Sequence, residues 1–291
     1  MLLFERVAVK QELSPVLGSA IGADKFSYKE GCNTTLALLT CHHHWLKWLA
    51  GAMDFVRVFS FDFSKAFDSV PHAIVCNKLM SLNMNPYVIN WIVSFLSNRK
   101  QRVVVDSFVI EFVSINRGVP QGTVLGPILF SIMGNDIRPV YPERNLLLKY
   151  AADLTLSVPV SAHQDQDQDH SLIEVNSIQH WAVGNRMTQN LTKTWEMLVH
   201  GRISKPLPPL LQRIERKSWL KLLGIIFSEN PSDWELHVDN LLRKASSRLY
   251  ILRVCKHFGY AKEQLTKLID LLIKSLFLYG IEIWRAAYQG Q

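Results

Sequence analysis

Residues 145–160 read NLLLKYAADLTLSVPV, and this stretch decides the fold class of the chain. Two apolar runs, 146–150 and 154–158, flank the tetrad Tyr150-Ala151-Ala152-Asp153. Short apolar runs separated by so few residues predict two antiparallel strands joined by a tight turn. The turn would present one carboxylate, that of Asp153, at the end of a buried hairpin.

A second apolar strand is predicted at residues 56–63 (VRVFSFDF), and it carries Asp62. A carboxylate in such a strand is costly to bury unless it is solvated, paired or bound to a metal. If this strand lies beside the hairpin, Asp62 and Asp153 meet. Phosphoryl transfer can use two divalent ions that clamp the reacting oxygens, and Mg²⁺ prefers carboxylate oxygens. The pair is therefore a candidate Mg²⁺ site, with an Asp62 that merely caps residues 64–67 as the alternative.

The composition is that of a globular protein, with 48% hydrophobic and 20% charged residues in a chain of 291. This length allows two or three subdomains. Without an apolar run of 18 residues, no membrane span is expected, and Glu5 and Arg6 interrupt the first ten residues in a way that excludes a signal peptide. Four cysteines without CxxC spacing favour reduced thiols inside the cell, with the nucleus as one candidate compartment.

The net charge of +7 is concentrated near the C-terminus. Residues 201–291 contain 15 Lys and Arg against 8 Asp and Glu, whereas the first 200 residues contain 17 of each. A basic C-terminal part suits a polyanionic partner such as nucleic acid, and a solvated basic surface explains the charge equally well.

The pattern around these segments is of mixed helices and strands followed by an all-helical basic end. Asp68 is expected to cap the helix that follows Pro71. His42, His43 and His44 cannot converge on one ion, because consecutive helical positions point in different directions. Helices are predicted at 34–50 (capped by Asn33 or Thr34), 71–83, 86–97, 124–137, 171–187, 234–258 and 261–284, strands at 101–106, 108–114 and 194–200, a hairpin at 218–227 around Gly224, and a polar loop at 165–170.

Four ordered motifs carry a family resemblance. VFSFDFSKAFDSVPH (58–72), RGVPQGTVLGPILFSIMGNDI (117–137), KYAADLTLSV (149–158) and NLTKTWEML (190–198) resemble reverse transcriptases of non-LTR retrotransposons, more closely than those of group II introns or telomerase. The resemblance runs from about Phe4 to the end of the chain. It implies an α+β right-hand polymerase fold: a palm with an antiparallel sheet, partial fingers and a helical thumb. It also implies RNA-templated DNA synthesis on Mg²⁺, with an RNA template, an RNA–DNA hybrid and deoxynucleoside triphosphates as partners and no membrane.

By the same resemblance, individual residues acquire roles. Asp62 resembles the first catalytic, metal-binding aspartate, and Phe67 the aromatic gate that selects deoxynucleotides, although a core aromatic would look the same. Gln121 and Gly122 resemble the loop that lines the nucleotide pocket, although a structural turn explains the glycine. Lys193 resembles the lysine near the incoming triphosphate, although a surface lysine would fit as well.

The tetrad departs from the family at one position. The family has aspartate at both final positions, and this chain has Ala152 followed by Asp153. Alanine has no ligand atom, so Asp62 and Asp153 alone remain to hold two ions. We therefore expect weakened Mg²⁺ binding and slow or absent polymerisation.

The resemblance assigns residues 1–52 to partial fingers, 53–217 to the palm with a fingers hairpin around 98–116, and 218–291 to the primer grip and a truncated thumb. Two other functions are open: a non-catalytic nucleic-acid-binding remnant, and a domesticated interaction protein. The sequence indicates no oligomeric state. The predicted phosphate-binding residues of the thumb are Arg243, Lys244, Arg248 and Lys256.

Overall fold

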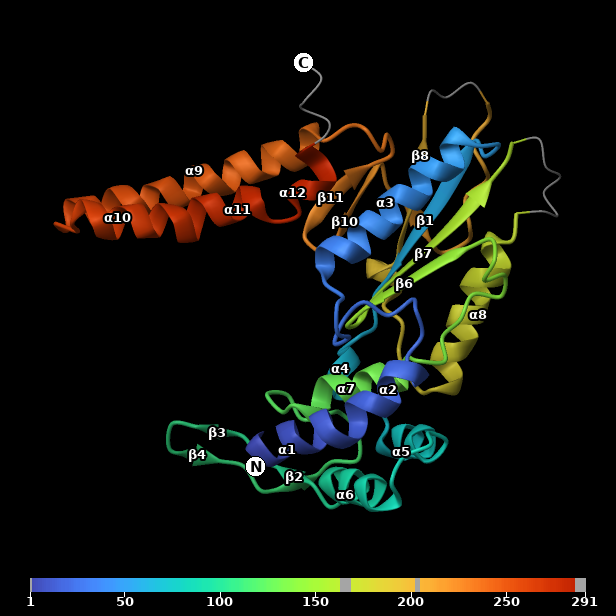
Figure 1. Cartoon of the computed structure of the whole chain (residues 1–291), viewed down its shortest axis with the longest axis vertical. Coiled ribbons are helices and arrows are strands. Elements are labelled where there is room, and N and C mark those ends of the chain that lie inside the picture. The colour runs from blue at the N-terminus through green and yellow to red at the C-terminus, as the bar shows by residue number, and fades with distance from the viewer. Residues whose placement is uncertain (1, 163–168, 202–204, 286–291) are drawn as a thin grey trace. The chain divides into compact units, whose positions relative to one another are not determined.

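The computed structural model describes residues 2–162, 169–201 and 205–285 (Figure 1). The predicted loop at 165–170 lies mostly outside these residues. The chain divides into two compact units. The first consists of residues 1–32, 60–156 and 169–194, and the second of residues 33–59, 157–168 and 195–291. No helix in the described part of the chain is long and apolar enough to cross a membrane.

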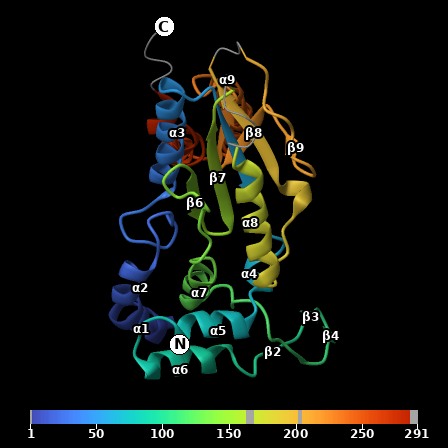
Figure 2. The ribbon, with the colours of Figure 1, turned by 90° about the vertical axis from the view of Figure 1, so that its right-hand side faces the viewer.

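A five-stranded sheet has the strand order β6-β7-β1-β8-β9, and the division between the units passes through β1 and β7. The short edge strand β9 runs parallel to β8 (Figure 2). Nearly every residue of β1 is buried, the charged Arg57 included, so the strand lies inside the sheet rather than at an exposed edge. The strands are β6 (Leu146–Tyr150), β7 (Asp153–Val160), β1 (Phe55–Phe61), β8 (Trp195–His200) and β9 (Glu215–Arg216).

The first unit contains most of the short helices and a β-ribbon that projects from it (Figures 1 and 2). Three N-terminal helical segments were not predicted. One of them supplies Glu5, whose buried carboxylate accepts hydrogen bonds from the backbone N–H groups of Val124 (2.9 Å) and Leu125 (3.4 Å) at the start of α7. The helices are α1 (Leu2–Ala8), η1 (Val9–Leu13), α2 (Ser14–Ala20), α4 (Ala66–Ser69), α5 (His72–Met80), α6 (Pro86–Leu96), α7 (Leu125–Met133), α8 (Ser171–Gly184) and η3 (Leu191–Lys193), and the ribbon strands are β2 (Lys100–Gln101), β3 (Val104–Val105), β4 (Phe108–Val109) and β5 (Val113–Ser114).

In the second unit, α3 (Thr34–Ala50) begins as predicted, because the Asn33 side chain accepts a hydrogen bond from the Leu36 N–H at 2.8 Å. The hairpin of β10 (Trp219–Leu222) and β11 (Ile225–Ser228) also forms as predicted. Its turn residues Leu223 and Gly224 have φ values of 45° and 93°, a conformation that glycine adopts readily.

The C-terminal helices differ in part from prediction. The first, α9 (Glu235–His257), forms where it was expected. The single helix predicted at 261–284 is wrong, because the chain leaves helical geometry after Leu278 and Gly280 has φ 61°. The Tyr279 hydroxyl donates to the Leu223 carbonyl of the hairpin at 2.5 Å, which anchors the break. The segments are α10 (Lys262–Ile269), η4 (Asp270–Lys274), α11 (Ser275–Leu278) and α12 (Ile281–Trp284).

A buried ion pair stabilises the second unit. Arg57 on β1 and Glu196 on β8 are both fully buried, and the Arg57 Nε donates to Glu196 Oε1 at 2.6 Å. Arg216 donates to the same carboxylate from β9 (2.9 Å). The Arg57 Nη2 also donates to the Pro209 carbonyl at 3.0 Å. The buried Glu196 carboxylate is therefore shared by two guanidinium groups, that of the buried Arg57 and that of the partly exposed Arg216.

Replacing Glu196 with alanine should lower the free energy of unfolding by about 3–5 kcal/mol, because it removes the buried carboxylate that faces the Arg57 charge. Urea denaturation measures the loss. The matched control is Asp270→Ala, which removes an exposed i,i+4 pair with Lys274 and should cost less than about 0.5 kcal/mol. Equal losses of stability in the two variants would contradict the conclusion that the buried pair of Arg57 and Glu196 stabilises the second unit.

Candidate active site

Residues far away in the sequence stabilise the tetrad turn between β6 and β7 through hydrogen bonds to its backbone. Ala151 has φ 50°, a left-handed conformation that is unfavourable for alanine. Its N–H donates to the Ser27 hydroxyl at 2.6 Å, and its carbonyl accepts from the Lys25 ammonium at 3.4 Å. Residues 24–26 run along β6, since the Lys149 N–H donates to the Asp24 carbonyl (2.8 Å) and the Lys149 carbonyl accepts from the Phe26 N–H (3.0 Å).

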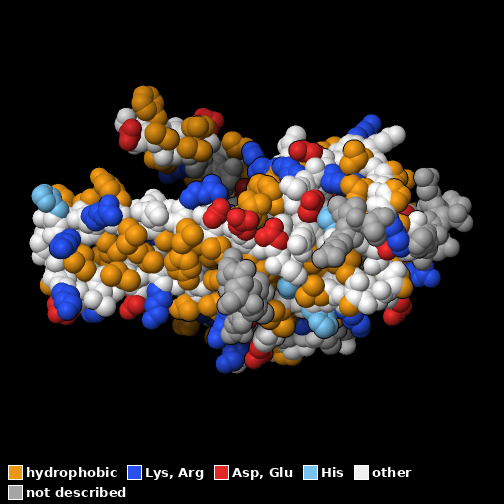
Figure 3. Space-filling model, turned by 90° about the horizontal axis from the view of Figure 1, so that it is seen from above, with side chains coloured by type: hydrophobic (Ala, Val, Ile, Leu, Met, Phe, Trp, Pro, Cys, Tyr) orange, Lys and Arg blue, Asp and Glu red, His pale blue; other side chains and the backbone are white. Residues whose placement is uncertain are grey.

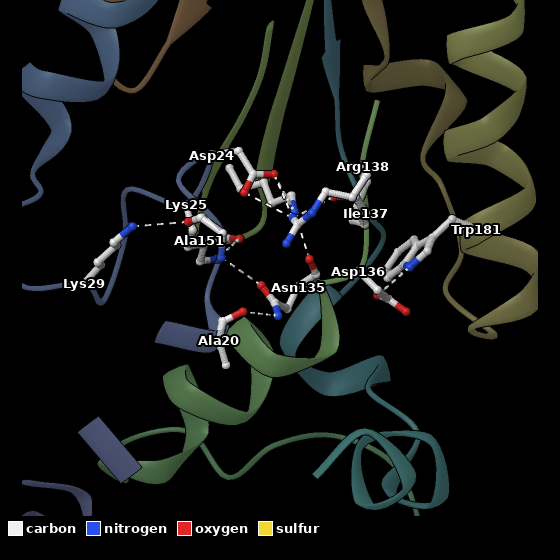
Figure 4. A network of polar contacts seen from close by, with 12 residues as sticks. Ala20, Asp24, Lys25, Lys29, Asn135, Asp136, Ile137, Arg138, Ala151 and Trp181 are labelled. Carbon is white, nitrogen blue, oxygen red and sulfur yellow. Dashed lines mark hydrogen bonds and ion pairs between the residues drawn. The ribbon is translucent and has the colours of Figure 1, made fainter. Parts of the chain in front are cut away.

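A polar network surrounds this segment (Figure 4). Asp24 pairs with the Lys149 ammonium at 2.8 Å and with the Arg138 guanidinium at 3.0 Å. Asn135 accepts from the Gly22 N–H and donates to the Ala20 carbonyl. Burial lowers the pKa of Lys149 to about 8, partly offset by Asp24.

The structure brings the two predicted catalytic carboxylates together. Asp62 follows β1, and its Oδ2 accepts from the Asn190 Nδ2 at 3.1 Å. The Asn190 N–H also donates to the Asp62 carbonyl at 2.8 Å. Asp153 begins β7. Burial raises the pKa of the Asp153 carboxyl, and the negative charge of Asp62 raises it further. The two carboxylates are thus close enough to repel each other.

The carboxylates of Asp62 and Asp153 are the donors that this site offers a metal ion. Asp62 and Asp153 supply carboxylate oxygens suited to Mg²⁺, but in the described part of the chain no group of three or more His, Cys, Asp or Glu residues could hold a metal ion. Ala152 adds a methyl group where a carboxylate would complete the set. That residue instead lines an apolar cavity of about 20 Å³, shared with Phe63, Phe130, Met133, Ile137, Trp181 and Met187 among others.

The motif loop at 118–122 folds back on α4. The Gly118 N–H donates to the Val70 carbonyl, and the Val119 N–H donates to the Phe67 carbonyl, both at 2.8 Å. The Gln121 amide donates to Asp68 Oδ1 at 2.9 Å. The prediction that Asp68 caps the next helix is wrong, because Pro71 is the N-cap of α5 and Asp68 faces Gln121 instead.

The other predicted nucleotide-binding residues lie in the same unit. Phe67 is half-buried and stacks on Phe130 with ring centroids 4.4 Å apart, so its packing role is present whether or not it also gates a nucleotide. Gly122 is exposed beside Gln121. Lys193 is exposed at the end of η3, three residues after the Asn190 that orients Asp62.

A basic pocket of about 690 Å³ adjoins this loop, and the sequence indicates only part of it. Its cationic lining comes from Lys65, Arg99, Lys100 and Arg117, beside Gln121. The basic run at 99–102 is a visible signal in the sequence. Lys65 and Arg117 give no separate signal, because each is a single basic residue and only the fold brings them next to that run.

The four predicted basic residues of α9 differ in exposure. Arg243 and Lys256 are exposed and Lys244 is half-buried. The Arg248 guanidinium donates to the Leu272 carbonyl, so it is engaged within the second unit. Figure 3 shows Lys and Arg side chains interspersed with hydrophobic ones on this helical part, where Leu242, Leu249 and Tyr250 are exposed.

Known proteins share this arrangement of motifs. The model of the family "Reverse transcriptase (RNA-dependent DNA polymerase)" matches residues 7–227. The chain belongs to this family.

Two curated relatives illustrate the kinship. The chain is 23% identical over 278 residues to a probable RNA-directed DNA polymerase from transposon BS of Drosophila melanogaster, covering 90% of this chain and 30% of the relative. It is 33% identical over 145 residues to the RNA-directed DNA polymerase from mobile element jockey of Drosophila funebris, covering 45% and 15%. The predicted resemblance to non-LTR retrotransposon reverse transcriptases is confirmed, and the chain spans less than a third of the length of these relatives.

Solved structures confirm the fold. Telomerase from Candida albicans, in complex with a TWJ fragment of telomeric RNA, matches with a TM-score of 0.52 at 14% identity, covering 96% of this chain and 50% of that one. The corresponding Candida tropicalis complex matches with a TM-score of 0.51 at 12% identity, covering 99% and 46%. The chain has the predicted α+β right-hand polymerase fold.

Two glycines of the motif loop should respond differently to alanine. At Gly118 (φ 88°) an added Cβ would lie 2.9 Å from the Asp68 carbonyl oxygen, whereas at Gly122 (φ 80°) nothing lies within 4 Å. Gly122→Ala should cost only the left-handed strain, about 1–2 kcal/mol. Gly118→Ala should cost about 1–3 kcal/mol more, because the loop must also move. Chemical denaturation of both variants measures the difference, and equal losses would show that the loop does not pack on α4 as described.

Proposed function

We propose that this chain is an RNA-directed DNA polymerase domain by descent, impaired in nucleotidyl transfer at Ala152, and that it retains nucleic-acid binding. The observation that carries the proposal is the tetrad turn. It presents Ala152 and Asp153 beside Asp62, with one carboxylate fewer than a two-ion centre needs. The partners are an RNA template, an RNA–DNA hybrid and deoxynucleoside triphosphates.

Asp62 and Asp153 are the residues that would hold Mg²⁺. A bound ion would stabilise charge on the reacting oxygens of the primer and the nucleotide. The chain's own contribution is orientation, because Asn190 donates to Asp62 from both its side chain and its backbone. With Ala152 in the tetrad, no third carboxylate holds the geometry, and misplaced reacting groups can cost about 100-fold in rate.

Further residues of the first unit are proposed to serve the nucleotide. Phe67 excludes a ribose 2′-hydroxyl, and Gln121 and Gly122 line the base and sugar. Lys193 neutralises the triphosphate. The hydrogen bond from Gln121 to Asp68 supports this role, because it holds the Gln121 amide in the lining of the basic pocket.

Each unit also offers its own basic surface for nucleic-acid phosphates. In the first unit this is the pocket lined by Arg99, Lys100 and Arg117. In the second unit it is the exposed part of α9 around Arg243 and Lys256, with Lys244 partly exposed. Phosphate contacts of this kind weaken steeply as salt rises. By family order, residues 1–52 are proposed as fingers, 53–217 as palm and 218–291 as primer grip and thumb.

Primer extension on an RNA template with Mg²⁺ tests the proposal, using this chain, Ala152→Asp, and Ala152→Asp combined with Asp62→Ala. The unmodified chain should extend at least about 100-fold more slowly than Ala152→Asp, because a third carboxylate restores the metal geometry. The double variant should not extend.

Binding of the labelled primer–template is measured in the same samples by gel shift. All three proteins should bind alike, with affinity that falls as salt rises. Extension by the unmodified chain at the rate of Ala152→Asp would contradict the impairment. Salt-insensitive binding, or none, would contradict the nucleic-acid-binding function.

A further inference from the structure

A buried lysine lies directly beneath the tetrad turn. Lys25 is only 4% exposed, and its ammonium donates to the Ala151 carbonyl. Lys25 and Ala152 line the same small cavity, together with Asp153. Lys25 and Ala152 therefore border a common space whose lining also includes Lys149 and is otherwise mostly apolar.

The positive charge of Lys25 is poorly compensated. Asp24, the neighbouring carboxylate, is shared by the Lys149 ammonium (2.8 Å) and the Arg138 guanidinium (3.0 Å). Within the residues that the structure describes, Lys25 makes no ion pair. Its remaining contact is the Phe130 ring, whose centroid is 5.9 Å from the ammonium. A buried ammonium with one carbonyl and one ring as partners attracts any carboxylate that comes within reach.

We propose that Lys25 weakens the binding of divalent cations at the tetrad, as a second obstacle that adds to the missing carboxylate at Ala152. The inference takes the position of the metal site from the proposed function. An ammonium beneath the turn adds positive charge where a divalent ion would have to bind, and like charges repel strongly away from water. A carboxylate restored at position 152 would border the same cavity as Lys25, and the ammonium would compete with a divalent ion for it, so Ala152→Asp would bind the ion less tightly than it would without the lysine.

The network in Figure 4 explains why the lysine stays in place. The chain at residues 24–26 is fixed along β6 by backbone hydrogen bonds on both sides of Lys149. The backbone of Lys25 is therefore held beside β6, and its ammonium is held by the hydrogen bond to the Ala151 carbonyl. Removing the charge requires a substitution, and Lys25→Met keeps an unbranched apolar side chain to fill the same space.

Mn²⁺ affinity of the full chain, measured by titration calorimetry without nucleotide, tests the proposal. The variants are Ala152→Asp, Lys25→Met, and the two combined. The double variant should bind Mn²⁺ at least ten-fold more tightly than Ala152→Asp. The matched control combines Ala152→Asp with Lys29→Met. Lys29 follows on the same segment and donates to the Gly22 carbonyl, but it does not line the cavity. This control should bind Mn²⁺ like Ala152→Asp alone.

Melting temperature in EDTA gives a second readout. Ala152→Asp should melt higher than the unmodified chain because of the new ion pair, and adding Lys25→Met should abolish that gain. Circular dichroism checks folding, and Lys25→Gln replaces Lys25→Met if the latter does not fold. If Ala152→Asp binds Mn²⁺ as tightly as the double variant that also carries Lys25→Met, the proposal is overturned. Neither readout requires primer extension, so failure of the polymerase proposal would be seen separately.

Discussion

The hydrogen bonds that hold the turn at Ala151 are the constraint on which the site depends. Alanine in a left-handed conformation is unfavourable, and a two-residue turn that contains it needs outside support. That support comes from the Ser27 hydroxyl and the Lys25 ammonium, which bind the two backbone polar groups of Ala151. Because the turn is fixed, the directions of the side chains at positions 152 and 153 are fixed as well.

Electrostatics then determine what this fixed turn can do. Burial raises the pKa of the Asp153 carboxyl, and the negative charge of Asp62 raises it further. A metal centre would relieve this repulsion, and one more carboxylate would complete it. This chain instead has a methyl group at position 152 and a buried ammonium below it. The fold thus brings the two carboxylates of the proposed centre together, while the third position of the tetrad has no charge to hold an ion.

Much of this arrangement could be predicted from the sequence, because the relevant signals are local. Strand periodicity located the hairpin of the tetrad and the strand before Asp62, and Asn33 capped its helix as expected. The proximity of Asp62 and Asp153 followed from placing those strands side by side.

What could not be predicted depends on contacts that are distant in sequence. Asp68 has the local pattern of a helix cap, but the Gln121 amide lies beside it instead. The break after Leu278 depends on the hydrogen bond between Tyr279 and Leu223. Lys25 has no local pattern that relates it to position 152, because only the pairing of residues 24–26 with β6 brings the two together. The hydrogen bond from the Arg248 guanidinium to the Leu272 carbonyl likewise cannot be predicted from the residue pattern of α9 alone, because Leu272 lies on another helical segment.

The most direct test of the account is the anomalous scattering of manganese in crystals of the unmodified chain grown with Mn²⁺. The account predicts no pair of ordered Mn²⁺ ions between Asp62 and Asp153, because the donors are too few. Two anomalous peaks about 3.5–4 Å apart at these carboxylates, the separation of a working two-metal centre, would contradict it.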